Sequence, residues 1–195
     1  MLIIYALDTL YNMMYLKMIP VSSAVRLNIA LLDNYLDIPF LMIALLFFCP
    51  NKQNQKKVYL LTLLFIGYEL VITFLFGFSP KSVVYILGPG IALIWFYSLF
   101  LFTRQIKFTI SRGKNTGRTL MLASILFAYS CYGLVYYFFY VQKTKFLEDT
   151  YLIYFISSTV SNTLMGIGLA LAKRRLKKLN DLKVTRRELH LFFNT

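Results

Sequence analysis

The chain has 195 residues, of which 58% are hydrophobic and only 15% are charged. A soluble domain of this size is nearer half apolar and a quarter charged. Because each bilayer crossing takes about 20 apolar residues, about six crossings would use most of the chain. The composition therefore predicts an integral membrane protein and excludes a sizeable soluble catalytic or binding domain.

The charge balance is strongly basic, with 21 Lys and Arg against 8 Asp and Glu and a net charge of +13. In a membrane protein, basic residues in short loops are the usual determinant of orientation, so we expect no nucleic-acid partner. The two cysteines, Cys49 and Cys131, lie in apolar runs with no histidine nearby. This placement predicts neither a disulfide framework nor a metal site.

Six apolar runs follow one another along the chain. The first, residues 2–19, is short and contains Asp8; a signal peptide is the alternative, but residues 1–4 lack the positive charge typical of one. The sequence predicts an all-α polytopic bundle, residues 1–172, of six transmembrane helices. These cover residues 2–19, 27–49, 58–78, 82–103, 119–141 and 150–172.

The distribution of Lys and Arg among the connections predicts the orientation. With six crossings, 16 of these residues fall on one side of the membrane and 5 on the other. Cytoplasmic loops carry the excess of basic residues. We therefore expect both termini in the cytoplasm, with the bacterial inner (plasma) membrane as the location.

Several polar side chains lie deep in these runs. Asp37, Glu69 and Asn162 are within one residue of the centres of the second, third and sixth runs, and Asp8 and Asn12 straddle the centre of the first. An ionised carboxylate at this depth costs at least about 2.5–3.5 kcal/mol, so we expect each acid to face the bundle interior. Two interpretations stay open: hydrogen bonds that hold the helices together, or a site for a proton, cation or polar ligand.

The second run places two acids on one side of a helix. Asp33 and Asp37 are four residues apart and therefore lie on one face. Asp37 has no basic partner on its own helix. We therefore expect it to be neutral, or to share a proton or cation with Asp8 or Glu69. Pro39 predicts a kink, and the Gly-Pro-Gly sequence of residues 88–90 predicts a break or bend in the fourth helix.

The sixth run carries a small or polar residue at every fourth position: Ser158, Asn162, Gly166 and Ala170. Such a stripe permits close approach of another helix. We favour a contact inside the bundle, with Ser124 of the fifth run opposite, over a dimer interface.

Residues 173–195 form a basic tail with leucines near one face of a predicted amphipathic helix. Such a segment lies on an anionic inner leaflet, docks onto a partner, or acts only as an orientation signal. The basic residues that we expect to contact lipid or partner are Lys173, Arg174, Arg175, Lys177, Lys178, Arg186 and Arg187.

The chemistry that is missing narrows the function. The only histidine, His190, lies in the tail, so a histidine-based catalytic set or haem or zinc ligation inside the bundle is excluded. We expect no enzyme activity, no cofactor and no metal. The predicted function is that of an accessory or sensory subunit that binds another membrane protein, or itself, through its helices and tail. The alternative is a small transporter or channel component that moves a proton or cation by means of Asp33, Asp37 and Glu69.

Overall fold

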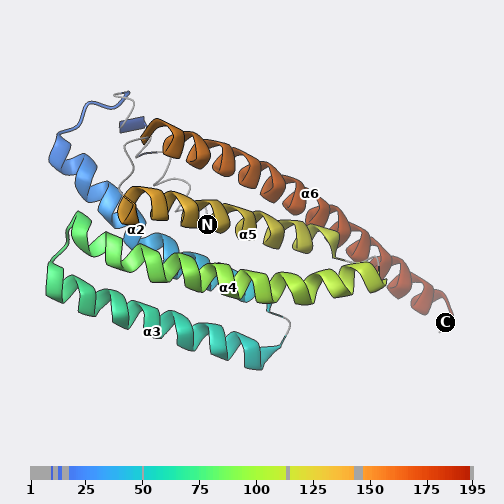
Figure 1. Cartoon of the computed structure of the whole chain (residues 1–195). Helices are drawn as coiled ribbons and strands as arrows, with labels where there is room; N and C mark the ends of the chain where they lie inside the picture. Colours follow the sequence, from blue (N-terminus) through green and yellow to red (C-terminus); the bar gives the residue numbers. More distant parts are fainter. Residues whose placement is uncertain are drawn as a thin grey trace.

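A computed structural model gives the fold (Figure 1). It describes residues 10, 13–14, 18–49, 51–112, 115–142 and 147–193. Five helices are long and apolar enough to cross a membrane, as expected of an all-α multi-pass membrane protein. They are α2 (Ser23–Leu45), α3 (Lys52–Phe76), α4 (Pro80–Arg112), α5 (Thr116–Tyr136) and α6 (Leu147–Phe193).

The first predicted helix is not among these five. Most of residues 2–19, including Asp8 and Asn12, lie outside the described residues. The count of six helices therefore stays a prediction.

Local sequence explains where the helices begin and end. Ser22 caps α2, because its hydroxyl accepts a hydrogen bond from the Val25 amide at 3.4 Å. Gly77 ends α3 with a φ of +70°, a conformation that glycine adopts without a steric penalty, and Pro80 starts α4. Asn115 takes the left-handed conformation, with a φ of +74°, just before α5.

Helices that follow one another in sequence lie side by side. Each of α3, α4 and α5 packs against the next helix, and α2 packs against both α3 and α4 (Figure 1). The core is apolar; Ile38 and Met42 of α2 and Ile86 and Ile94 of α4 are almost completely buried. Large apolar side chains cover the outside, with Phe74 of α3 91% exposed, which is suited to contact with lipid.

Two close helix contacts depend on glycine. A Cβ atom on Gly90 of α4 would lie 2.8 Å from Ile38 Cγ1 of α2. A Cβ atom on Gly117 of α5 would lie 2.6 Å from the carbonyl oxygen of Gly168 of α6. Small residues at helix contacts let the backbones approach and so increase van der Waals packing, the main attraction between helices in lipid.

Small side chains of α6 do pack against α5, but they are not the predicted ones. The Ser124 hydroxyl donates a 2.7 Å hydrogen bond to the carbonyl oxygen of Ser161. Gly168 lies on the same face, about two turns after Ser161. The predicted partner face is different: Asn162, Gly166 and Ala170 are exposed, and Ser158 is only half-buried.

The stripe predicted to pack inside the bundle is therefore not the one that meets α5. The reason is physical: α6 carries two stripes of small residues, and neighbouring residues on a helix are about 100° apart. Spacing alone does not decide which stripe faces inward. The stripe formed by Ser158, Asn162, Gly166 and Ala170 is called the outward stripe below.

The predicted break at residues 88–90 is also not found, because α4 is continuous from Pro80 to Arg112. Pro89 has no amide hydrogen and leaves the carbonyl oxygen of Tyr85 without its helical partner. The Tyr68 hydroxyl of α3 donates to this oxygen at 2.9 Å. A neighbouring helix thus satisfies the group that proline frees. Pro39 is likewise inside a continuous helix, α2.

The tail is a continuation of the last membrane helix. At about 1.5 Å per residue, the 47 residues of α6 span roughly 70 Å, more than twice a hydrocarbon core of about 30 Å. Its C-terminal part extends past the ends of the other helices (Figure 1).

Replacing glycine by valine should destabilise the protein on one face of α6 but not on the other. We expect Gly168→Val to lower the thermal stability of the purified protein by about 1–3 kcal/mol, because a Cβ atom there would lie 2.7 Å from Met121 Cγ and 2.9 Å from the Gly117 carbonyl oxygen. Gly166→Val is the matched control, because a Cβ atom on Gly166 meets nothing within 4 Å. Melting in detergent measures both; equal melting temperatures would contradict the packing.

Candidate functional site: polar groups inside the bundle

One of the predicted acids is hydrogen bonded across the bundle. The Tyr129 hydroxyl of α5 donates to Asp37 Oδ2 of α2 at 2.7 Å. Tyr129 is 6% exposed and Asp37 is half-buried, so this bond is partly shielded from the surroundings. Asp37 is therefore fixed to a residue 92 positions further along the chain.

Further aromatic rings extend from this bond. The ring of Tyr129 meets that of Tyr132 edge-on, with centroids 5.4 Å apart. Tyr132 in turn stacks on Tyr154 of α6 at 5.4 Å. The aromatic residues near the end of α5 thus include the direct partner of an acid. Asp33 is half-buried one turn before Asp37.

Glu69 has different surroundings. It belongs to the buried face of α3, with Thr62, Phe65 and Ile72. Glu69 is 7% exposed, and its Oε1 has no hydrogen-bond partner within the described residues. This face of α3 is turned toward α2 and α4, because Phe65 approaches Gly90 of α4 and Thr73 bonds to Tyr35 of α2.

A cluster of hydroxyl groups joins α2, α3 and α4 one turn from Glu69. The Tyr35 hydroxyl donates to Ser82 Oγ at 2.7 Å, and the Thr73 hydroxyl lies 3.0 Å from the Tyr35 oxygen. Thr73 Oγ1 is also 2.7 Å from the carbonyl oxygen of Glu69. We call Ser82, Tyr35 and Thr73 the hydroxyl chain. These residues were not predicted from the sequence, because single hydroxyl groups in apolar runs have no distinctive spacing.

The members of the predicted polar layer that the structure describes, Asp37, Glu69 and Asn162, lie in three different surroundings. Asp37 reaches toward α5, whereas Glu69 faces α2 and α4. Asn162 is exposed on the outward stripe of α6, so it does not join them. Over the ranges that the structure describes, no three His, Cys, Asp or Glu residues form a group that could hold a metal ion.

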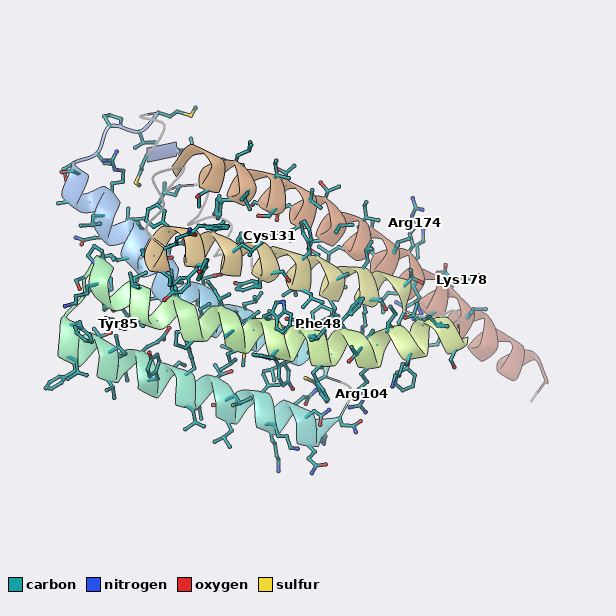
Figure 2. The ribbon with its side chains drawn as sticks, viewed as in Figure 1. Phe48, Tyr85, Arg104, Cys131, Arg174 and Lys178 are labelled. Atoms are coloured by element: carbon teal, nitrogen blue, oxygen red, sulfur yellow. The ribbon has the colours of Figure 1, made fainter. Side chains whose placement is uncertain are left out.

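Basic residues gather at the opposite end of the bundle from the α3–α4 turn. Figure 2 shows Arg104, Arg174 and Lys178 toward one end and Tyr85 toward the other. At the basic end, the Arg118 guanidinium lies 4.8 Å from the centroid of the Phe47 ring, a cation–π contact between α5 and the 3-10 turn Leu46–Phe48 that follows α2. Arg175 of α6 donates a hydrogen bond to Asn115 Oδ1.

The bond between Arg175 and Asn115 attaches the start of the tail to the residue that precedes α5. The remaining tail residues selected from the sequence follow on the same helix: Lys173, Arg174, Lys177, Lys178, Arg186 and Arg187. Lys173, Arg174, Lys177 and Lys178 are exposed.

Comparison of the chain with protein-family models, with curated proteins and with solved structures found no match.

The bond between Tyr129 and Asp37 gives a direct test of the polar interior. We expect Tyr129→Phe to lower the free energy of unfolding by about 0.5–1.5 kcal/mol, because the Asp37 carboxyl group loses the hydrogen bond from the Tyr129 hydroxyl. A double-mutant cycle with Asp37→Asn should give a coupling energy of about 0.5–2 kcal/mol. Denaturation in detergent measures each variant. Strictly additive effects would show that the two side chains do not interact.

Proposed function

We propose that the protein is an accessory or sensory subunit of a membrane complex, and that α6 is the helix that binds its partner. The observation that carries this proposal is the edge position of α6. Among the described elements it packs chiefly against α5, and its outward stripe is uncovered. Of the five spans it is the least buried.

The outward stripe has the chemistry of a helix interface in lipid. Asn162 lies about ten residues, or roughly 15 Å, before the first basic residue of the tail, which puts it near the middle of a hydrocarbon core of about 30 Å. An amide at that depth favours a partner that can bond to it. Gly166, with open space above its Cα atom, allows a second helix to come close.

The charge of the tail favours a particular class of partner. A second copy of this chain would have the same orientation in the membrane and would place another basic helix beside the first. Like charges at that distance repel. We therefore infer a different membrane protein, whose helix continues into an acidic segment at the basic end of this bundle.

The straight continuation of α6 also supports a protein partner over a lipid surface. A helix lying on the leaflet runs in the membrane plane, which requires a sharp change of direction after the last span. The described backbone of α6 has helical geometry through this region, from Leu147 to Phe193. Its basic residues then point to a partner in the aqueous phase, with anionic headgroups contacting only the first of them.

Two matched glycines test the binding face. We expect Gly166→Leu to weaken the isolated complex about tenfold, because the larger side chain holds the helices apart. Gly67→Leu on α3 is the control, because Gly67 is also exposed and a Cβ atom there would meet nothing within 4 Å. The measurement is the stoichiometry of partner retained on the purified full chain in mild detergent.

Removal of residues 173–195 should release the same partner as Gly166→Leu. If the complex survives both changes, α6 is not the binding helix. If the retained partner is a second copy of the chain, repulsion between the basic tails does not select the partner.

We also propose that the basic end lies in the cytoplasm of a bacterial cell. The support is the positive-inside rule together with the gathering of Arg104, Arg174 and Lys178 at one end (Figure 2). A fluorescent protein that folds only in the cytoplasm should be active when fused after residue 195 and inactive when inserted after Ser79 in the α3–α4 turn. The reverse pattern would overturn the orientation.

A further inference from the structure

Glu69 is a buried acid on α3 and takes no part in the partner binding proposed for α6. It is 7% exposed, and its Oε1 has no hydrogen-bond partner among the described residues. Placing an ionised carboxylate in a low-dielectric interior without a partner is far more costly than placing the neutral acid there. A proton on Glu69 removes most of that cost.

The hydroxyl chain begins within reach of this carboxyl group. Thr73 is one helical turn after Glu69, and side chains four residues apart are neighbours on one face of a helix. Thr73 Oγ1 lies 2.7 Å from the carbonyl oxygen of Glu69 and 3.0 Å from the Tyr35 hydroxyl. The single hydroxyl hydrogen of Thr73 can therefore turn toward the Glu69 carbonyl oxygen or toward the Tyr35 hydroxyl. For the carboxyl group to reach the same hydroxyl, the Glu69 side chain has to rotate.

The other end of the chain of hydroxyls reaches the α3–α4 turn. Tyr35 donates to Ser82 Oγ at 2.7 Å, and Ser82 Oγ accepts from the Ser79 amide at 3.2 Å. Ser79 is half-buried in a turn whose other residues, from Gly77 to Pro80, are exposed. Each hydroxyl in this series can accept one proton and donate another.

We propose that Glu69 is a proton-binding site, and that it exchanges its proton with water at the α3–α4 turn through Thr73, Tyr35 and Ser82. On loading, a proton passes from hydronium at the turn to Ser82. Each hydroxyl then gives its own hydrogen to the next, and the Glu69 carboxylate becomes a carboxylic acid. Unloading follows the hydrogen bonds as they stand, in which Thr73 donates to Tyr35 and Tyr35 donates to Ser82. Loading requires each hydroxyl to turn and donate toward Glu69. Neither direction consumes an oxidant or other reactant.

Other charged and titratable groups lie on the same three helices. On α2, Asp33 and Asp37 flank Tyr35 in sequence, and Asp37 bonds to Tyr129 of α5. On α3, Tyr68 bonds to the carbonyl oxygen of Tyr85. On α4, Lys81 is exposed at the turn, and its ammonium lies 5.2 Å from the centroid of the Phe76 ring.

Infrared spectroscopy of the full chain in lipid nanodiscs tests the site directly. A protonated carboxyl group has a C=O stretching band that shifts when its hydrogen is replaced by deuterium. We expect Glu69→Gln to abolish one such band, whereas Asp37→Asn leaves that band in place. The melting temperature of each variant checks that it is folded.

The rate of deuterium exchange tests the path. After transfer to D2O, the Glu69 band should shift about tenfold more slowly in Thr73→Val and in Tyr35→Phe. Each change removes one hydrogen-bonding hydroxyl from the hydroxyl chain. Thr73→Ser restores the hydroxyl and should restore the rate. Tyr68→Phe is the matched control, because the Tyr68 hydroxyl bonds to a backbone carbonyl oxygen and not to a member of the hydroxyl chain.

If Glu69→Gln removes no carboxyl band, Glu69 is ionised and the proton site is refuted. If exchange is equally fast without the Thr73 and Tyr35 hydroxyls, the path is refuted. Both results are independent of α6, so they do not depend on whether the proposed partner exists.

Discussion

Polar groups inside this bundle have to find partners within the protein, because the hydrocarbon core of a membrane offers no water. This constraint explains contacts that otherwise look unrelated. The Tyr68 hydroxyl donates to the carbonyl oxygen that Pro89 frees, so α4 passes through proline without a break. The Tyr129 hydroxyl donates to Asp37 and so joins two helices that are far apart in sequence. In each case a tyrosine supplies a hydroxyl at the end of an apolar ring.

The two faces of α6 follow from the same constraint. Toward α5, serine hydroxyls bond to backbone oxygens, as Ser124 does to Ser161, and glycines bring the backbones together. Next to the outward stripe, the exposed residues Thr159 and Thr163 bond back to carbonyl oxygens one turn earlier on α6. Asn162 has no such bond in the described part of the chain. It is the residue on this face that a second helix would satisfy.

The sequence was sufficient to predict the class of fold, because apolar runs of about 20 residues are long-range signals with a simple physical cause. It was not sufficient to predict which residues face each other. The two small-residue stripes of α6 differ by a rotation about the helix axis, and only the packing of α5 selects between them. The partner of Asp37 was equally out of reach, since Tyr129 was one of several tyrosines near the end of its helix.

The contact between Gly117 and Gly168 also has a mechanical consequence. Gly168 lies near the middle of α6, with 21 residues before it and 25 after it. This close contact divides α6 into two arms of roughly 30 and 40 Å at about 1.5 Å per residue. Rocking α6 by about 10° about this contact would move its C-terminal tip by several Å and its N-terminal tip by a similar amount in the opposite direction. A small force at one surface of the membrane would in this way become a displacement at the other.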